Sequence, residues 1–326
     1  MVQLSVVVPV YGCRDCLDQL HRRLTKALEP ITSSYQLVFV DDRSSDGAWP
    51  VLEGLSQSDP HVKAIRLSRN FGQHAAITAG LASSEGDWTV VMDCDLQDPP
   101  EAIPGLYARA NEGFDLVLAR RKVRSNSRVR QLLSRTYFKL LNTFMGTNID
   151  AGFGTFSILN RKVVDAFLSL GERDRHYLFV LHWLGFEQGT MEIEQGTRAS
   201  GKSSYTVRQL VRHAVSGIFF QTTTLLLYIV YLGFFVAAAG VLLAAFLIYL
   251  DLAAHPQPGW VSVMVLILVI GGFIITSTGV TGLYIGRVFQ QVKGRPLYVV
   301  DSIVRKTQDR KAVGEKTPLQ EVESIH

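Results

Sequence analysis

The sequence predicts an α/β domain with a mostly parallel, buried sheet, followed by two membrane-spanning helices. Three observations support this fold class. Short apolar runs alternate with helical stretches over the first 160 residues, two uncharged apolar stretches of spanning length follow residue 214, and the polar clusters fall where the predicted strands end. A chain of 326 residues can hold both parts, and its 47% hydrophobic content is high for a soluble enzyme.

The alternation in the N-terminal part predicts βαβ units. Five apolar runs rich in Val, Leu and Ile are expected to be strands: Leu4–Val10, Leu37–Val40, Val62–Leu67, Thr89–Met92 and Leu116–Ala119. Between them, Cys16–Leu28 and Glu101–Asn111 repeat apolar residues at helical spacing. Strands separated by helices form parallel sheets covered on both faces, and ligands bind in the crevice at the carboxyl ends of such strands.

The C-terminal part predicts a membrane hairpin. Residues 225–250 and about 260–284 can each span a bilayer, and the short polar turn between them has no Lys or Arg. Basic flanks at Arg198–Arg212 and Arg287–Lys306 predict that both termini are cytoplasmic. The predicted boundaries are 1–205 for the N-terminal domain, 206–221 for an amphipathic helix beside the membrane, 222–286 for two spans and 287–326 for a polar tail. A pair of buried core helices is the alternative.

Charge and cysteine content narrow the function classes. The net charge of +4 is modest, and no long basic run indicates nucleic acid. Three cysteines (Cys13, Cys16 and Cys94) are too few for a disulfide framework, so a reducing compartment is expected. Cys13 and Cys16 have the C-x-x-C spacing of some redox sites, but the second cysteine pair of a zinc site does not accompany them.

The strongest local signal follows the fourth predicted strand. Asp93 and Asp95 stand two residues apart where this strand ends in a loop, with Gln97 after them. Two such carboxylates can converge on Mg²⁺ or Mn²⁺ and leave open positions for diphosphate oxygens. The metal would stabilise the charge on a departing nucleotide diphosphate. A solvated loop is the alternative, because D-x-D is a common pattern.

A second acidic pair, Asp41 and Asp42, ends the second predicted strand ahead of Ser44-Ser45-Asp46-Gly47. Carboxylates there can accept hydrogen bonds from a base N–H or from ribose hydroxyls. A simple turn and helix cap is the alternative.

A basic cluster follows the fifth predicted strand and leads into a helix with an apolar face. Its members are Arg120, Arg121, Lys122, Arg124, Arg128 and Arg130. Guanidinium groups suit phosphate geometry, and basic residues beside an apolar face suit anionic lipid headgroups. A solvated basic face is the alternative.

In combination these motifs resemble the inverting glycosyltransferases of family 2, which have the Rossmann-like GT-A fold. The resemblance is carried by Val7–Tyr11, Asp41–Gly47, Arg69–Ala76 and Asp93–Glu101. It is closer to the polyisoprenyl-phosphate group, which includes dolichol-phosphate mannose synthase, bactoprenol glucosyl transferase and the undecaprenyl-phosphate formamido-arabinose transferase. It continues through Arg198–Tyr205, Tyr284–Arg287 and Arg295–Tyr298, and so covers about residues 4–300 in one order.

The resemblance implies a role for each matched residue. The nucleotide-sugar pocket would contain Pro9, Tyr11, Asp41, Asp42, Arg69 and Asp93. The metal, Mg²⁺ or Mn²⁺, would be held by Asp93, Asp95 and Gln97. The acceptor phosphate would be bound by Arg120, Arg130, Ser134, Arg198 and Lys202. The catalytic set would be Asp95, Asp150, Arg120, Arg130 and Ser134; Asp150 would act as a base or hold the sugar, with a structural loop role as the alternative.

The activity implied is inverting transfer of a sugar from a nucleotide diphosphate-sugar to undecaprenyl or dolichyl phosphate. We expect UDP ahead of GDP and a catalytic domain on the cytoplasmic side of a bacterial inner membrane. A lipid phosphate is already ionised near pH 7, so it needs no strong general base. The donor, the lipid and the bilayer are the expected partners, and a homo-oligomer stays open. The alternatives are a processive polysaccharide synthase, which would need more spans, and a catalytically silent, membrane-tethered sugar-nucleotide binding protein.

The sequence departs from the family at three places. Gly12-Cys13 replaces the usual Asn-Glu, and Cys94 stands where Ala is commoner. Arg43 follows Asp42 where a small residue such as Gly is usual. Its guanidinium could crowd the nucleotide pocket or add a cation to it.

Overall fold

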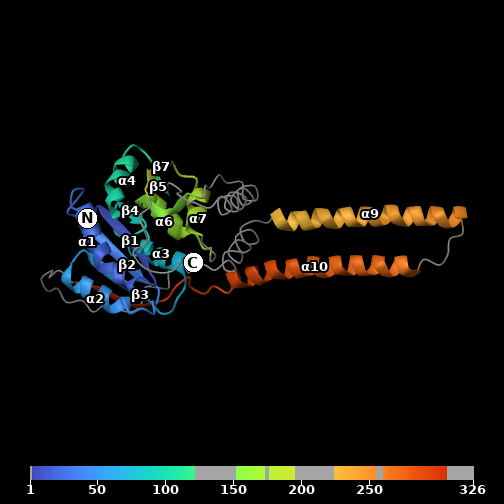
Figure 1. The fold of residues 1–326 in the computed structure, drawn as a ribbon, viewed down its shortest axis with the longest axis horizontal. Coiled ribbons are helices and arrows are strands. Elements are labelled where there is room, and N and C mark those ends of the chain that lie inside the picture. Colours follow the sequence, from blue (N-terminus) through green and yellow to red (C-terminus); the bar gives the residue numbers. More distant parts are fainter. Residues whose placement is uncertain (1, 122–151, 173–175, 195–223, 255–259, 307–326) are drawn as a thin grey trace.

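The computed structural model describes residues 2–121, 152–172, 176–194, 224–254 and 260–306 (Figure 1). Five residues expected at the site lie outside these ranges: Arg130, Ser134, Asp150, Arg198 and Lys202. The amphipathic helix predicted at 206–221 also lies outside them.

An eight-stranded sheet forms the centre of the N-terminal domain, in the order β7-β5-β6-β4-β1-β2-β3-β8. Each of the five predicted runs overlaps a strand: β1 (Leu4–Val10), β2 (Tyr35–Asp41), β3 (Val62–Leu67), β4 (Trp88–Val91) and β5 (Leu116–Arg121). Three more strands complete the sheet: β6 (Phe153–Asn160), β7 (Gln188–Ile193) and β8 (Val300–Arg305).

The sheet is mixed: four of its seven pairs of neighbouring strands are parallel, in agreement with the prediction of a mostly parallel sheet, and three are antiparallel. The strands β4, β1, β2 and β3 are parallel neighbours, and β5 is parallel to β7. However, β6 runs antiparallel between β4 and β5, and β8 runs antiparallel to β3. The parallel group follows from the βαβ alternation at the start of the chain, whereas β6 and β8 enter the sheet without such a crossover.

Helices cover both faces of the sheet (Figure 1). On one face lie α1 (Leu17–Leu28), α2 (Ala48–Ser58) and α4 (Ile103–Ala110), with the short 3₁₀ helices η1 (Arg14–Cys16) and η2 (Pro100–Ala102). On the other face lie α3 (Gln73–Ala82), α6 (Arg161–Ser169) and α7 (Tyr177–Leu184). Successive side chains of β1 alternate between the two cores, as a strand buried on both faces requires.

Close packing sets the position of α3 on the sheet. A Cβ atom on Gly80 would lie 2.2 Å from Cγ1 of Val7, so only glycine lets this helix approach β1 so closely. The N-terminus of α3 is thereby fixed beside the carboxyl ends of β1 and β4.

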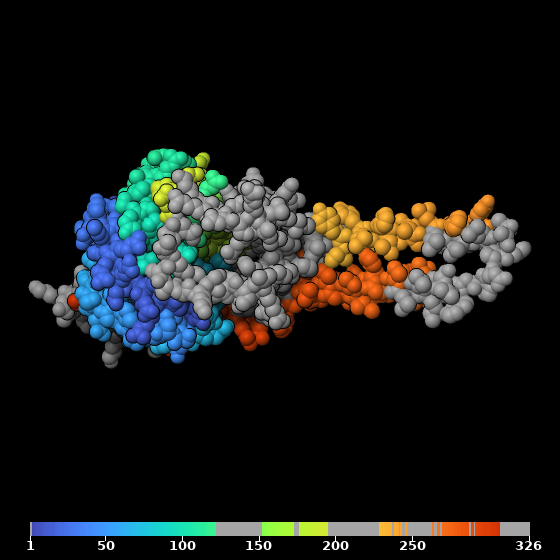
Figure 2. Space-filling model, in the orientation of Figure 1, coloured from blue at the N-terminus to red at the C-terminus, as the bar shows by residue number. Residues whose placement is uncertain are grey.

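Two long helices project from the domain, α9 (Thr224–Ala254) and α10 (Trp260–Val292), and they run side by side (Figures 1 and 2). Within the described residues, one window, Val269–Gly286, is long and apolar enough to cross a membrane by length and composition, with a mean hydropathy of 1.5 and no burial inside the protein. A shorter apolar segment, Tyr228–Gly240, lies in α9.

The chain returns to the sheet after α10. Residues 300–305, which the sequence analysis placed in the polar tail, form β8 at the free edge of β3. The backbone N–H of Ser68 donates to Val299 O at 2.9 Å, and the hydroxyl of Ser56 donates to Val304 O at 2.9 Å. This edge strand has no buried apolar run, which is why hydrophobic periodicity did not reveal it.

Candidate functional site

The carboxyl ends of β4, β1, β2 and β3 lie along one edge of the sheet, because these four strands are parallel neighbours. Asp41 ends β2, and the loops that follow the four strands carry the other predicted polar residues: Tyr11, Asp42, Arg69, Asp93 and Asp95. The structure therefore brings together residues that are up to 84 positions apart (Tyr11 to Asp95).

The loop after β1 is tied to the loop after β2. The N–H of Gly12 donates to the hydroxyl of Ser44 at 2.8 Å, and the N–H of Arg14 donates to Asp46 at 2.9 Å. Pro9 is buried inside β1, whereas the side chain of Tyr11 is 56% exposed. Of these two predicted pocket residues, only Tyr11 presents its side chain to solvent at the strand end.

The carboxylate of Asp42 holds the loop after β3. It accepts hydrogen bonds from the N–H groups of Phe71 at 2.7 Å and Gly72 at 2.9 Å. Burial raises the pKa of Asp42, and these two backbone N–H groups oppose the rise. The guanidinium of Arg69 lies over the ring of Phe71 at 4.1 Å, so the same loop presents a cation beside the acidic pair.

Asp41 is fully buried beside Arg66. Its Oδ1 accepts from the N–H of Ser44 at 2.9 Å, and its Oδ2 lies 3.6 Å from Nε of Arg66. In the described part of the chain neither Oδ2 nor this Nε has a hydrogen-bond partner. Burial raises the pKa of Asp41 above its usual value.

Arg43 adopts a left-handed backbone conformation with φ 56°, and its guanidinium has an acidic partner. Its Nη1 lies 2.9 Å from Oδ2 of Asp301 on β8. The C-terminal strand thus supplies the counter-charge for Arg43, which is at one of the three places where this sequence departs from the family pattern.

The loop after β4 carries Asp93 and Asp95. Oδ1 of Asp93 accepts hydrogen bonds from Gln73 at 2.7 Å and from Thr155 at 2.8 Å. Burial, and then the neighbouring carboxylate of Asp98, raise the pKa of Asp93 to about 6. Asp95 accepts at 3.1 Å from the backbone N–H of Gln97, which closes a tight turn around Leu96 at φ 63°.

Arg121 joins this loop from β5. Its guanidinium donates two hydrogen bonds to the buried Asp98, at 3.0 and 2.8 Å, and lies 3.5 Å from Oδ2 of Asp93. A Cβ on Gly154 would lie 2.9 Å from Cζ of Arg121, so this glycine of β6 opens the space for the guanidinium. Arg120 points the other way, as the alternation of a strand requires, and lies 3.8 Å from Glu192 of β7.

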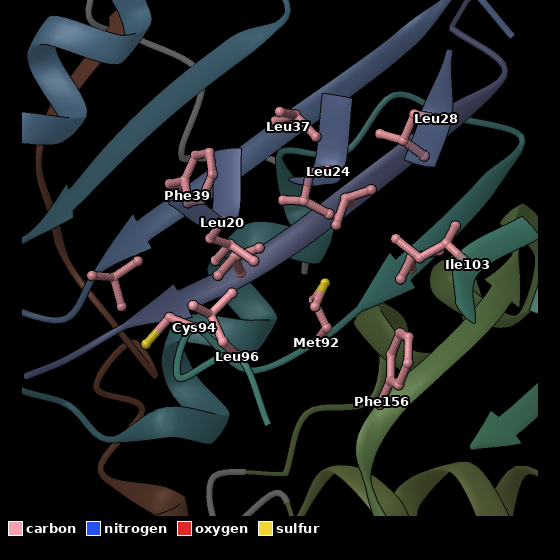
Figure 3. Close-up of a cluster of buried hydrophobic side chains, with 14 of the residues drawn as sticks. Leu20, Leu24, Leu28, Leu37, Phe39, Met92, Cys94, Leu96, Ile103 and Phe156 are labelled. Atoms are coloured by element: carbon pink, nitrogen blue, oxygen red, sulfur yellow. The ribbon is translucent and has the colours of Figure 1, made fainter. Parts of the chain in front are cut away.

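A disulfide joins Cys13 in the loop after β1 to Cys94 between the two aspartates. The sequence analysis did not foresee this bond, because it considered only whether three cysteines could form a disulfide framework, and one pair is enough to cross-link two loops. Cys16 is not part of this disulfide and is buried in the same hydrophobic cluster. Figure 3 shows Leu96 close to Leu20 in that cluster, with Cys94 beside Leu96.

The side chains around Asp93 supply some of the oxygen ligands that a hard divalent cation requires. Asp93 and Asp95 offer carboxylate oxygens, and the pKa of Asp93 is raised by burial and then by the carboxylate of Asp98, an effect that a bound cation would oppose. Within the described ranges no group of three or more His, Cys, Asp and Glu side chains forms a complete metal shell. In the part of the chain that the structure describes, Gln97 is a further candidate ligand, and a bound diphosphate or water could supply others.

Four residues of the site were not in the predicted set: Gln73, Asp98, Arg121 and Thr155. Gln73 and Asp98 lie inside the motifs that carry the family resemblance, and Arg121 lies in the basic cluster, so each had a sequence signal. Thr155 had none, because its contact depends on the antiparallel insertion of β6 beside β4.

Comparisons with known proteins agree with this arrangement. The family model described as Glycosyl transferase family 2 matches residues 5–168. An uncharacterized glycosyltransferase of Synechocystis sp. is 34% identical over 93% of this chain and 96% of its own length. The bactoprenol glucosyl transferase of Shigella phage SfII is 33% identical over 92% of this chain and 97% of its own.

The chain is also similar to a third curated relative and to a solved structure. The undecaprenyl-phosphate 4-deoxy-4-formamido-L-arabinose transferase of Salmonella choleraesuis is 33% identical over 93% of this chain and 94% of its own length. The crystal structure of glucosyl-3-phosphoglycerate synthase from Mycobacterium tuberculosis aligns with a TM-score of 0.46 at 16% identity, over 68% of this chain and 80% of that one. The family match and the mixed α/β sheet indicate a GT-A-like fold. The chain therefore belongs to glycosyltransferase family 2 and is a glycosyltransferase.

Proposed function

We propose that the protein transfers a sugar from a nucleotide diphosphate-sugar to polyisoprenyl phosphate, with inversion at the anomeric carbon, at the cytoplasmic face of a membrane. The observation that carries this proposal is the loop of Asp93 and Asp95 at the sheet edge, with Arg121 held against it by Asp98. Carboxylates for a metal and a fixed guanidinium are what a departing diphosphate and an incoming phosphate need.

The pair of Asp41 and Arg66 is the candidate contact for the nucleotide base, which we expect to be the uracil of UDP ahead of the guanine of GDP. Since Oδ1 of Asp41 is taken by Ser44, one acceptor oxygen remains beside one guanidinium N–H. This combination matches the N3–H and adjacent carbonyl of uracil, and guanine offers the same pair of groups as N1–H and O6. Both atoms are buried, so the contact needs a small shift of the Arg66 side chain, which is 27% exposed. Tyr11 could then stack on the base.

We infer that Asp93, Asp95 and Gln97 hold Mg²⁺ or Mn²⁺ together with the donor diphosphate. When bound, the cation would offset the charge that develops on the leaving nucleoside diphosphate. Gln73 and Thr155 hold the carboxylate of Asp93 in a fixed orientation, and Arg121 keeps a positive charge beside it. A site organised in this way before the donor binds needs little rearrangement during the reaction.

A lipid phosphate as acceptor explains the two projecting helices. Relatives at 33% identity are named for bactoprenol and for undecaprenyl phosphate, and they match over nearly their whole lengths. A phosphate oxygen, ionised near pH 7, would attack the anomeric carbon directly and so invert it. We propose that Arg120, Arg130, Ser134, Arg198 and Lys202 bind this phosphate, and that Asp150 holds the sugar or acts as a base.

The membrane arrangement is also part of the proposal. The apolar helices α9 and α10 would span the bilayer, and the basic residues outside them would keep both termini and the catalytic domain in the cytoplasm. Only seven residues, 293–299, separate the end of α10 from β8, so the catalytic domain would be held close to the headgroups. A lipid phosphate at headgroup height is then within reach of the domain.

Thermal unfolding of the full chain in detergent tests the donor site. UDP-glucose with Mn²⁺ or Mg²⁺ should raise the Tm, since a ligand at 100 times its Kd stabilises by about 2.7 kcal/mol, and GDP-mannose should raise it less. The same titration with Asp95→Asn should give little shift. A screen in which no nucleotide sugar changes the Tm with either cation would contradict the proposed donor class.

A further inference from the structure

The four loops at the sheet edge are cross-linked into one unit. Asp42 joins the loops after β2 and β3, Ser44 and Asp46 join those after β1 and β2, and Gln73 joins α3 to the loop after β4. All of these ties are hydrogen bonds. The loop after β1 and the loop after β4 are joined instead by the disulfide of Cys13 and Cys94, which can be opened and closed by chemistry.

The disulfide acts on the backbone that carries the metal carboxylates. Cys94 stands between Asp93 and Asp95, and its Cα lies 6.4 Å from that of Cys13. Cys94 and Leu96 are buried in the hydrophobic cluster, with 7% and 3% exposure, whereas Asp93 and Asp95, which alternate with them, are only partly buried. The disulfide keeps Cys94 in the hydrophobic cluster and so keeps the neighbouring carboxylates of Asp93 and Asp95 out of it.

The partner side of the disulfide is also fixed. The loop of Cys13 passes through Gly12, at φ 71°, whose N–H is bound to Ser44, and Cys13 itself is 4% exposed and begins η1. The sulfur of Cys94 is thus anchored to a rigid corner of the domain. Opening the bond would leave the loop after β4 held at this point only by packing.

We propose that Cys13 and Cys94 form a reversible thiol–disulfide site that sets the affinity of the donor and metal site. In the oxidised chain the loop of Asp93 and Asp95 is preorganised, so binding of a nucleoside diphosphate with a divalent cation costs little ordering of the loop. In the reduced chain the loop has more freedom, and binding is weaker. The ligand in this statement comes from the proposed function, but the change in the loop does not depend on it.

The redox step is a two-electron thiol–disulfide exchange. A disulfide oxidant of the glutathione class takes two electrons and two protons from the thiols of Cys13 and Cys94, and is released as two thiols. A dithiol reductant reverses the step and is itself oxidised to a disulfide. Cys16 keeps its thiol in both states, which makes it the matched control.

The first measurement is the number of thiols that react with maleimide in the unfolded, full-length chain. We expect one reactive thiol after purification without reductant and three after phosphine reduction. Hydrogen exchange of the peptide covering residues 92–98 should then become faster on reduction, and the affinity for UDP with Mn²⁺ should fall roughly tenfold, equivalent to about 1.4 kcal/mol.

Variants separate this bond from a general effect of reductant. Cys16→Ala should respond to reduction as the wild type does, whereas Cys13→Ser should have the properties of the reduced state under all conditions. Three reactive thiols without reductant, or unchanged hydrogen exchange and affinity on reduction, would overturn the proposal. If UDP binds in neither state, the proposed function fails, and the exchange of the 92–98 peptide still decides the redox proposal.

Discussion

The guanidinium of Arg121 makes a two-pronged ion pair with Asp98, which is fully buried, and lies 3.5 Å from the carboxylate of Asp93. Two oxygens of Asp98 and the space left by Gly154 hold the guanidinium plane in one orientation. A cation is thus built into the loop that carries the two candidate metal carboxylates. Its neighbour Arg120 is exposed and faces Glu192 instead.

Replacing Arg121 should therefore impair transfer more than replacing Arg120. Arg121→Gln leaves the buried Asp98 without its counter-charge and removes the cation beside Asp93. Loss of charge-assisted hydrogen bonds of about 1.5–3 kcal/mol corresponds to a roughly ten- to a hundredfold loss in kcat/KM. The measurement is transfer by both variants under the same conditions, with the Tm of each as the folding control. An unchanged kcat/KM for Arg121→Gln at an unchanged Tm would show that the geometry around Asp98 does not govern activity.

The pKa of Asp93 leads to a prediction in which stability and activity change in opposite directions. With a pKa of about 6 against an ordinary value of 3.8, the folded chain binds the proton more tightly than the unfolded chain between these values. Its stability should fall as pH rises from about 4 to 6, and the loss persists at neutral pH. Asp93→Asn keeps an oxygen for Gln73 and Thr155 without the charge.

The Tm of Asp93→Asn without divalent cation at pH 7.5 should therefore exceed that of the wild type. Because Asp93 is partly exposed, we expect about 1–2 kcal/mol, equivalent to a rise of roughly 2–8 °C. The difference should shrink toward pH 4, where the wild-type carboxyl is protonated, and transfer should be lost. A lower Tm for the variant at pH 7.5 would mean that the charge of Asp93 is stabilised in the folded chain.

Because β8 pairs with β3, we can predict where the chain can be shortened without loss of stability. A chain ending at residue 299 loses the strand paired with β3, the counter-charge of Arg43 and the contact of Ser56 with Val304. We expect a lower Tm and weaker donor binding. A chain ending at Lys306 retains β8 and should match the full-length protein in both measurements. Equal behaviour of the two truncated chains would mean that β8 does not support the donor site.

The topology can be tested by cysteine labelling. Basic residues outside the two apolar helices, and none between them, predict that the turn between the helices faces away from the cytoplasm. In a chain without its native cysteines, a membrane-impermeant maleimide added outside should label Gln257→Cys and not Arg310→Cys. The reverse result would place the catalytic domain on the side that lacks nucleotide sugars.

The parallel half of the sheet was predictable from sequence because its strands are continuous apolar runs separated by helices. The bounds of β1 and β3 agree with the predicted Leu4–Val10 and Val62–Leu67. The strands β7 and β8 were not predictable in this way, because as edge strands they bury only some of their residues. The mixed character of the sheet depends on β6, whose place between β4 and β5 is a long-range pairing.

The sequence was enough to predict which loops form the site, but not the contacts between these loops. Motif spacing located the loops of Asp42 and Asp93, because functional side chains follow the carboxyl ends of parallel strands. The hydrogen bonds of Asp42 to the loop after β3 could not be foreseen, since they depend on how two loops meet. Whether the side chain of Arg120 or that of Arg121 faces the loop of Asp93 depends on the register of β5. A shift of one residue would exchange their positions.

The central claim is transfer to a lipid phosphate, and one assay tests it most directly. Full-length protein in detergent or vesicles is given radiolabelled UDP-glucose, with GDP-mannose as second donor, together with Mn²⁺ or Mg²⁺ and undecaprenyl phosphate. We predict an organic-soluble, labelled product and nucleoside diphosphate release only when donor and lipid phosphate are both present, and neither with Asp95→Asn. Nucleoside diphosphate release that is independent of the lipid, with no labelled lipid from any sugar donor, would contradict the account.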